Sequence, residues 1–468
     1  MTDLSYATAL ELKDAIATKK LSPVELVKAS LARLDELEPK LNCFVTVTPE
    51  LALEAARAAE KAVMSGRPLG ALHGLPISVK DVLPVQGVRL TTGSKAFADT
   101  VAQIDAPVVE RLKAAGACIV GKTTTPEFGA KAVGTSPLTG ATRNPWNTAM
   151  GSGGSSAGAA ASVAAGVTPF SVGTDGGGSI RIPCSFTHLF GVKPQFARVA
   201  MYPVSAATTL AHCGPIARTV RDAALLLTTQ AGFDPRDAWT VAEPVPDYLR
   251  ACEQSPKGMR VAWSPTFGFA KPDPEVLKIA ETAALAFRDL GCEVELVEKV
   301  FDEDPVGMWS SEFYAGIATR LKPIMDKSPE LMDPAVVHIL EAATRQTLAE
   351  YYGNVFKRYE FREKTRQFFE RYDLLLSPTL PVAPFDALRD MPQELEGTDR
   401  NVVSWVYYTY AFNLTGQPAA SIPAGFTRDR LPVGLQMVSR LYRETDIFRA
   451  AAAFEALRPW AQEKPPID

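Results

Sequence analysis

Apolar residues along this chain occur in two kinds of pattern, a helical period and short continuous runs. Near the start, apolar residues recur every three or four positions over residues 22–37 and again over Glu50–Met64, which predicts two amphipathic helices. The first helix begins with a capping box, because Ser22 stands at the N-cap, Pro23 at the first helical position and Glu25 three residues after the cap. Short continuous apolar runs follow, and their length is typical of buried strands. They are LPISV at 75–79, ACIVG at 117–121, VAWS at 261–264, VELV at 294–297 and DLLLSP at 373–378.

These strand-like runs alternate with helix-like segments over most of the sequence. A further helix is indicated by DPEVLKIAETAALAFRDLG, with Asp273 as N-cap and Pro274 at the first helical position. No internal repeat and no low-complexity linker interrupts the alternation. The sequence therefore predicts an α/β fold in which a large mixed, mostly buried β-sheet is flanked by helices on both sides.

Composition and charge narrow the class of protein. The 468 residues carry a formal net charge of −4 and form no basic stripe, which argues against nucleic acid and against an anionic membrane as partners. The first residues lack the layout of a secretory signal, and no apolar run approaches the ~18 residues of a membrane-spanning helix, so we expect a cytoplasmic protein. The four histidines and six cysteines show no metal-ligand spacing. We expect free cysteines, no metal and no other cofactor.

The candidate chemistry lies in Gly151–Pro183, where two serines flanked by glycines are separated by a run of small residues. Ser155 follows a double glycine, and Ser179 follows three glycines in TDGGGS. A serine nucleophile needs a base that accepts its proton, and Lys80 directly follows the strand-like run LPISV. One lysine and two serines are enough to supply such chemistry.

The TDGGGS segment is not expected to form a helix or a strand, because three successive glycines weaken both and let the backbone approach a ligand closely. A turn of this kind aims several N–H groups at one point, as in an oxyanion hole for a tetrahedral intermediate. We assign that role to the N–H groups of Gly176, Gly177, Gly178 and Ser179. An isolated GGGS segment more often only turns a corner, so the assignment depends on the serines and the lysine around it.

Together these segments resemble the amidase signature family, whose members are serine hydrolases with a Ser-Ser-Lys triad. The resemblance extends over most of the chain, and only about 235–370 lacks a recognised family motif. It rests on GLPISVKD at 74–81, GKTTTPEFG at 121–129, TRNPWN at 142–147, GGSSAG at 153–158, GTDGGGSIRIP at 173–183, GVKPQ at 191–195, GPIARTVRDAALLL at 214–227, DLLLSPTLPVAP at 373–384, FNLTGQPAASIPAGF at 412–426 and LPVGLQMVS at 431–439.

The resemblance implies an amidohydrolase that cleaves a linear carbon–nitrogen bond through an acyl-enzyme and releases a carboxylic acid and an amine or ammonia. Ser179 is then the nucleophile, Ser155 the bridging serine and Lys80 the terminal base of a two-step proton relay. The resemblance also implies a cis peptide bond at Ser155 and a small-molecule amide as substrate. Anilides, esters and carbamates share this chemistry. The sequence neither ranks them nor decides whether the protein is a homo-oligomer.

Lys80 accepts a proton only as a neutral amine, although the reference pKa of lysine is about 10.4. We therefore expect burial among its apolar neighbours Leu75, Ile77 and Val79 to lower the pKa of Lys80. A carboxylate close to the amine would oppose this effect, and Asp81 is the next residue. Alternation along a strand places consecutive side chains on opposite faces, which keeps the two groups apart.

Other residues around the serines are expected to support the site. We interpret Asp175 and Arg181 as an ion pair that holds the shape of the nucleophile turn. Thr174 and Ser156 are interpreted as nearby hydrogen-bonding partners. The backbone near Gly129 is expected to meet the substrate carboxamide.

Two further residues bear on this site. Gly176 stands where many members of the family carry threonine or an aliphatic residue, which leaves the width of the pocket open. If His212 were the base for Ser179, its replacement by alanine would abolish turnover. We expect only a modest loss.

Length alone would allow two or three domains. We expect a single domain over 1–468, since Lys80 must meet Ser179 and the segments after 370 resemble the continuation of the same sheet. We divide it into N-terminal helices over 1–65, the signature core over 66–234, a variable helical wall or lid over about 235–370, and the C-terminal part of the sheet over 371–468. Aromatic residues of the wall are candidates for the pocket, although core packing is the commoner role. They are Trp309, Phe313, Tyr314, Tyr351 and Tyr352.

Alternative functions are compatible with parts of the sequence. The amidase-type subunit of a tRNA-dependent amidotransferase resembles this chain through the same triad, but TPEFG and QFARVAMYP differ from the segments usual there, which favours a free-standing hydrolase. An inactive scaffold on the same fold is disfavoured by the intact triad. The segment Gly116–Thr123, GACIVGKT, fits the P-loop pattern of nucleotide-binding proteins. Its middle residues are interpreted as a buried strand after a helix that ends at Gly116, with Lys122 on the solvent side or in a structural role.

Overall fold

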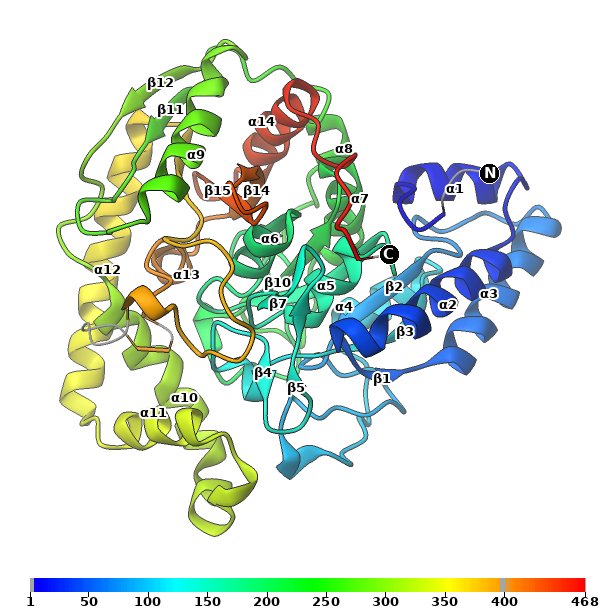
Figure 1. The fold of residues 1–468 in the computed structure, drawn as a ribbon, viewed down its shortest axis with the longest axis horizontal. Coiled ribbons are helices and arrows are strands. Elements are labelled where there is room, and N and C mark those ends of the chain that lie inside the picture. Colours follow the sequence, from blue (N-terminus) through cyan, green and yellow to red (C-terminus); the bar gives the residue numbers. More distant parts are fainter. Residues whose placement is uncertain (1–3, 396–400, 403, 468) are drawn as a thin grey trace.

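One large sheet forms the centre of the computed structural model, which describes residues 4–395, 401–402 and 404–467 (Figure 1). Over these residues eleven strands form the sheet, in the order β1-β3-β2-β8-β10-β9-β14-β15-β13-β11-β12. Their bounds, in that order, are Phe44–Val47, Cys118–Thr123, Pro76–Lys80, Phe170–Asp175, His212–Ala217, Phe190–Lys193, Ala419–Phe426, Pro432–Ser439, Leu374–Pro378, Arg260–Trp263 and Glu293–Leu296. The five apolar runs noted in the sequence form β2, β3, β11, β12 and β13, as predicted.

The sheet is mixed, which confirms that part of the prediction. β2 lies parallel to β3 and β8, and β11 lies parallel to β12 and β13. The other neighbouring pairs are antiparallel. Two short hairpins lie outside this sheet. They pair β4 (Thr135–Ser136) with β5 (Gly140–Ala141), and β6 (Arg143–Asn144) with β7 (Asn147–Gly151).

Helices cover both faces of the sheet, as predicted. Along β13, Leu374 and Leu376 belong to one apolar core and Leu375 to another, because successive side chains of a strand point to opposite faces. The first core contains side chains of α1 (Ala9–Ala17), α4 (Pro107–Ala114), α7 (Val220–Gln230), α8 (Tyr248–Ala251), α9 (Pro274–Leu285) and α14 (Glu444–Leu457). The second contains side chains of α6 (Arg181–Thr187), α10 (Val306–Lys327), α11 (Pro334–Thr344), α12 (Leu348–Arg371) and α13 (Ala411–Thr415). Smaller clusters hold α2 (Pro23–Leu41), α3 (Pro49–Met64) and α5 (Ala157–Ala164).

The segment from about 235 to 370 is not wholly a helical wall, which corrects the division made from the sequence. Its first half supplies β11 and β12 at the edge of the sheet, because the apolar runs VAWS and VELV pair beside β13. Of its described helices, α10, α11 and α12 form the wall, with α10 and α11 at the lower left of Figure 1 and α12 along its left side. We propose that the chain forms one domain, because strands from both ends of the sequence share one sheet.

The ends of several helices follow the local sequence as expected. The Ser22 hydroxyl accepts the N–H groups of Val24 and Glu25, and the Glu25 carboxylate accepts the Ser22 N–H. Asp273 caps α9 in a similar way, with Pro274 as the first helical residue. α4 ends just before Gly116, whose φ of +86° requires glycine.

The P-loop pattern does not form a phosphate-binding loop in this fold. Its last six residues form β3, which is buried along its whole length. Lys122 Nζ lies 2.7 Å from Asp81 Oδ1, and both side chains are fully buried. Of the two roles expected for Lys122, the structural one therefore holds, and a solvent-side position is excluded because β3 is buried along its whole length.

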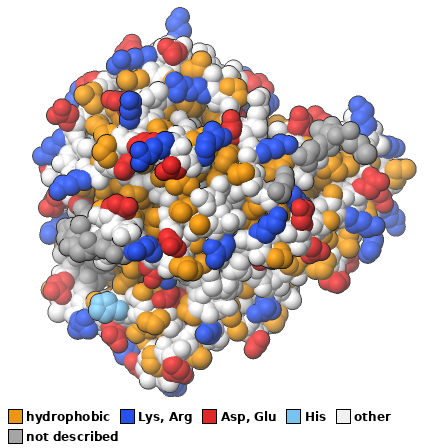
Figure 2. Space-filling model, in the orientation of Figure 1, with side chains coloured by type: hydrophobic (Ala, Val, Ile, Leu, Met, Phe, Trp, Pro, Cys, Tyr) orange, Lys and Arg blue, Asp and Glu red, His pale blue; other side chains and the backbone are white. Residues whose placement is uncertain are grey.

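The described helices include none that is both long and apolar enough to cross a membrane. On the face shown in Figure 2, acidic and basic side chains are intermingled with apolar ones.

Candidate active site

Neighbouring parallel strands bring the candidate residues together at the edge of the sheet that is formed by the C-terminal ends of these strands. Lys80 is the last residue of β2, and Asp175 is the last residue of β8 beside it. The turn 176–180 leaves β8 and leads into α6, so Ser179 lies just beyond this edge. Ser155 lies in the loop immediately before α5, which packs against both strands. Parallel strands end at the same edge of a sheet, and this explains how residues far apart in the sequence meet here.

Lys80 is fully buried and faces Ser155. Its Nζ lies 2.7 Å from Ser155 Oγ and 2.9 Å from Thr174 Oγ1. Burial lowers the pKa of Lys80 to about 7, although the nearby Asp175 carboxylate acts in the opposite direction. At neutral pH a substantial fraction of such a lysine is uncharged, as a general base has to be.

The Asp81 carboxylate lies away from the Lys80 amine, as strand alternation predicts. It accepts the N–H groups of Thr91 at 2.9 Å and Thr92 at 3.1 Å. Its other oxygen pairs with Lys122. The negative charge next to Lys80 in sequence is thus neutralised on the opposite face of the strand.

Ser155 and Ser179 line the same pocket. Ser179 keeps 9 % of its surface exposed and Ser155 keeps 2 %, so Ser179 is the more accessible of the two. The Ser156 N–H donates to Ser179 O and the Ser156 hydroxyl to Thr174 O, each at 3.1 Å, and these contacts tie the two loops together. The Gly154–Ser155 peptide bond is cis. Among the described contacts no hydrogen bond joins the two serine hydroxyls directly.

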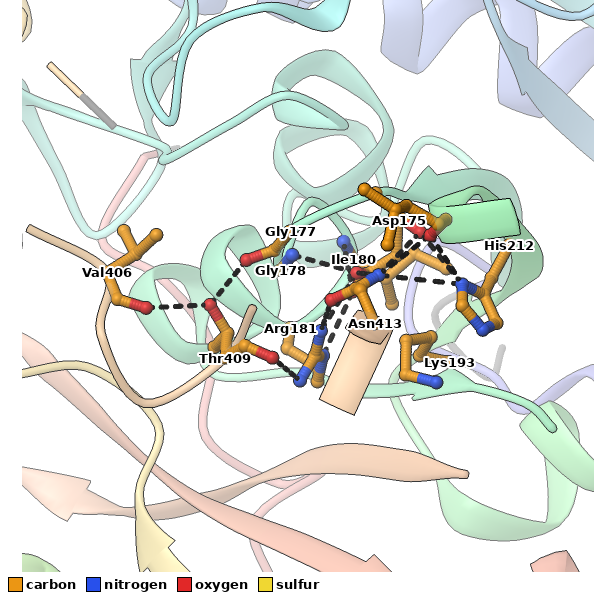
Figure 3. Close-up of polar contacts among 12 residues, drawn as sticks. Asp175, Gly177, Gly178, Ile180, Arg181, Lys193, His212, Val406, Thr409 and Asn413 are labelled. Carbon is orange, nitrogen blue, oxygen red and sulfur yellow. Dashed lines mark hydrogen bonds and ion pairs between the residues drawn. The ribbon is translucent and has the colours of Figure 1, made fainter. Parts of the chain in front are cut away.

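The Asp175 carboxylate organises the turn that carries Ser179 (Figure 3). It accepts the N–H groups of Gly178 at 2.8 Å and Ile180 at 3.2 Å. Arg181 Nη2 and Asn413 Nδ2 each lie 2.9 Å from Asp175 Oδ1, so the ion pair expected from the sequence is present. Burial raises the pKa of Asp175, but the Arg181 cation outweighs burial and holds the pKa well below its usual range. The carboxylate therefore stays charged and fixes the turn.

One N–H group that we assigned to the oxyanion hole is engaged elsewhere. The Gly178 N–H donates to Asp175 Oδ1, so it is not available to a substrate oxygen, and that part of the assignment is wrong. The cause is the Asp175 side chain, which folds back along its own turn. The N–H groups of Gly176, Gly177 and Ser179 meet no acceptor among the described residues. These three remain the candidate donors.

The pocket beside the serines is large and mostly apolar. Its volume is about 530 Å³, and Gly129 lies in its wall, next to Ser155. In the described part of the chain the only charged lining residues are Asp175, which is paired with Arg181, and Arg320. Apolar lining residues include Leu83, Phe97, Phe128, Met201, Phe313 and Ile317.

Two of the five aromatic candidates line the pocket or its recess, and the other three do not. Phe313 lines the pocket, and Trp309 lines a small recess next to Ser179. Tyr314 is buried and its hydroxyl donates to a backbone carbonyl at 3.0 Å. Tyr351 and Tyr352 are not among the described lining residues, and Tyr352 is half exposed on α12.

His212 is not placed as a base. Its Nδ1 lies 2.8 Å from Leu210 O and 3.3 Å from Asp175 O. Burial lowers the pKa of His212 well below its ordinary value, so the ring stays neutral. Among the described residues its hydrogen-bond partners are the backbone of the site and the Asn413 side chain, and none is a serine.

Three residues that support the turn were missed in the sequence. Arg181 donates to Thr409 O at 2.8 Å, Gln436 Oε1 at 2.8 Å and Asn413 Oδ1 at 2.7 Å. Asn413 and Gln436 lie in the segments FNLTGQPAASIPAGF and LPVGLQMVS. We recognised both segments as family motifs but assigned no role to these two residues. Thr409 lies outside any motif that we recognised.

Comparison with known proteins gives one consistent picture. The model of the Amidase family matches residues 25–448. The chain is 36% identical over 467 residues to an acylamidase of Rhodococcus erythropolis, with 99% of this chain and 98% of the relative covered. It is 34% identical over 488 residues to a glutamyl-tRNA(Gln) amidotransferase subunit of Geobacter metallireducens, with 99% of each chain covered.

The fold also matches that of a solved structure. A bacterial aryl acylamidase described as a member of the amidase signature enzymes superimposes with a TM-score of 0.92 at 30% identity, over 98% of this chain and 97% of the other. The large mixed sheet is therefore the amidase signature fold.

Proposed function

The chain belongs to the amidase signature family of hydrolases, which act on amide carbon–nitrogen bonds, and we propose that Ser179, Ser155 and Lys80 carry out this reaction here. The observation that carries the proposal is the 2.7 Å contact between Lys80 Nζ and Ser155 Oγ, made by a lysine whose pKa burial lowers to about 7. A buried lysine of this kind is a suitable base for a serine that has no histidine partner.

The reaction follows from these positions. Neutral Lys80 accepts the proton of Ser155 while Ser155 accepts that of Ser179, and Ser179 Oγ attacks the amide carbonyl carbon. The carbonyl oxygen becomes an oxyanion that the free N–H groups of the turn stabilise. The C–N bond then breaks, and the leaving nitrogen takes a proton back through Ser155 from the Lys80 ammonium. Water attacks the acyl-enzyme by the same relay and releases the carboxylic acid.

We propose amides with an aliphatic or aryl group as substrates, because the pocket wall is mostly apolar. Burying such a group against Phe313, Phe128 and Met201 contributes about 25 cal/mol per Å² of apolar surface. The same oxyanion hole accepts anilides, esters and carbamates, which differ in the leaving group.

The alternative of an amidotransferase subunit remains relevant because of the 34% identity to such proteins. The pocket supports it less well. Glutamine carries an ammonium and a carboxylate, whereas among the described lining residues Arg320 is a cation and the one carboxylate, Asp175, is already paired. We therefore propose a free-standing hydrolase.

A substrate panel tests this proposal. Purified protein is assayed for amine or ammonia release from aliphatic amides, benzamides, anilides, carbamates and glutamine, and for acid release from esters. We expect turnover of apolar amides or anilides, and none with Ser179→Ala. Ser152→Ala is the matched control, because Ser152 lies in the same segment and, among the described residues, its hydroxyl donates only to Ala157 O, at 3.3 Å. Glutamine as the preferred substrate, or activity that requires a second subunit, would contradict the proposal.

A further inference from the structure

The three glycines before Ser179 are each in contact with a side chain from a distant segment. A Cβ at Gly176 would lie 2.7 Å from Phe313 Cε2, and one at Gly177 would lie 2.6 Å from Trp309 Cζ2. A Cβ at Gly178 would lie 2.4 Å from Thr409 Oγ1. The turn is therefore glycine-rich because α10 and the loop before α13 press directly on its backbone.

Two of these side chains also hold carbonyl groups of the turn. Thr409 Oγ1 lies 2.5 Å from Gly177 O, and Figure 3 shows it between Gly177 and Val406. The N–H in the same peptide unit belongs to Gly178 and is held by Asp175 at 2.8 Å. This peptide unit is thus fixed at both ends and has no donor left.

The preceding peptide unit is different. Its carbonyl, Gly176 O, accepts the Trp309 Nε1–H at 2.8 Å. Its N–H belongs to Gly177 and meets no acceptor among the described residues. In a planar trans peptide the C=O and N–H bonds point in opposite directions, so the group that holds the carbonyl also sets the direction of the N–H.

We propose that Trp309 is a positioning residue of the oxyanion hole: through Gly176 O, its indole N–H aims the Gly177 N–H at the oxygen of the tetrahedral intermediate. The inference deepens the proposed function and rests on it. It assigns a role in the reaction to α10, a helix that carries none of the motifs shared with the family.

The indole ring is held firmly enough for this role. It stacks on Phe313 with centroids 4.8 Å apart and on Tyr410 with centroids 5.3 Å apart, at interplanar angles of 23° and 19°. The Tyr410 hydroxyl is itself fixed by Asp304 Oδ1 at 2.6 Å. A donor held in this way keeps its geometry during the reaction, and such preorganisation gives an oxyanion hole its effect.

The test replaces Trp309 with phenylalanine, which keeps an aromatic ring and removes the N–H. The matched control is Trp460→Phe, because Trp460 Nε1 also donates to a backbone carbonyl at 2.8 Å, that of Arg218, and does not line the pocket. Both variants are compared with wild type for kcat and KM on one anilide. The affinity for a phenylethyl trifluoromethyl ketone is measured as well, since Ser179 converts this ketone into a tetrahedral oxyanion.

We expect Trp309→Phe to lower kcat about tenfold and to weaken ketone binding by a similar factor, with KM within about twofold of wild type. The expected loss in kcat is smaller than the roughly 10²–10³-fold loss seen when an oxyanion donor itself is removed. Trp460→Phe should change neither. An unchanged kcat, or a loss confined to KM, would overturn the inference and make Trp309 part of the pocket wall only.

Two further outcomes remain decisive. If Trp309→Phe does not fold, a benzothienylalanine at position 309 replaces the N–H by sulfur at nearly constant shape, and the same result is expected. If wild type turns over no substrate, the proposed function fails, whereas the ratio of ketone affinities still tests the role of Trp309.

Discussion

Lys80 and Asp81 are consecutive residues whose charged groups lie on opposite faces of one strand end. The Lys80 amine meets Ser155 at 2.7 Å, while the Asp81 carboxylate meets Lys122 at 2.7 Å. Because the Asp81 carboxylate does not contact the Lys80 amine, burial lowers the pKa of Lys80 to about 7. The base of the proposed relay depends on this separation.

The pH dependence of the wild-type reaction follows from the Lys80 pKa. The relay needs the neutral amine, so kcat/KM should rise through an apparent pKa near 7 and fall about tenfold per pH unit below it. A pH–rate profile on a neutral amide measures this. A profile that stays flat down to pH 4 would contradict a neutral-lysine base.

Asp81→Asn tests whether the Asp81 carboxylate stabilises the fold through Lys122 without affecting the pKa of Lys80. The substitution leaves the fully buried Lys122 without its partner, and breaking a buried pair costs about 3–5 kcal/mol of stability. We expect a clearly lower midpoint in thermal unfolding. The midpoint of the pH–rate profile should remain near that of wild type, because Asp81 does not face Lys80. A shifted profile with unchanged thermal stability would contradict the separation of the two groups.

The contact between Gly176 and Phe313 predicts a double-mutant effect. Gly176→Ala places a methyl group 2.7 Å from Phe313 Cε2, which should displace the ring or the turn and lower kcat/KM for aryl amides about tenfold. Phe313→Ala opens the pocket and should weaken the binding of aryl substrates. In the double variant the clash is gone, so we expect kcat/KM to exceed that of Gly176→Ala alone. Simple multiplication of the two losses would contradict direct contact as the cause.

Much of the fold was predictable because its strands are short apolar runs bounded by turns, and each of the five that we singled out forms a strand. The glycines around the two serines drew attention to this segment, and the roles of Ser179, Ser155 and Lys80 came from the resemblance to the amidase signature family. Strand order was not predicted, since it depends on contacts between segments far apart in sequence.

Other details that the sequence did not predict have similar causes. The engagement of the Gly178 N–H depends on the rotamer of Asp175, and the burial of Lys122 depends on layers packed on both faces of β3. The contacts of Trp309 and Thr409 with the turn join segments far apart in sequence, and no local pattern points to them.

The central claim is that Ser179 forms the acyl-enzyme with Lys80 as the terminal base. The most direct measurement mixes wild type, Ser179→Ala and Lys80→Ala with an excess of an aryl ester, quenches with acid, and locates the acyl group by intact mass and peptide mapping. The account predicts an acyl group on Ser179 in wild type, none in Ser179→Ala, and greatly slowed acylation in Lys80→Ala. An acyl group on Ser155 or on another residue, or acylation of Lys80→Ala at the wild-type rate, would contradict it.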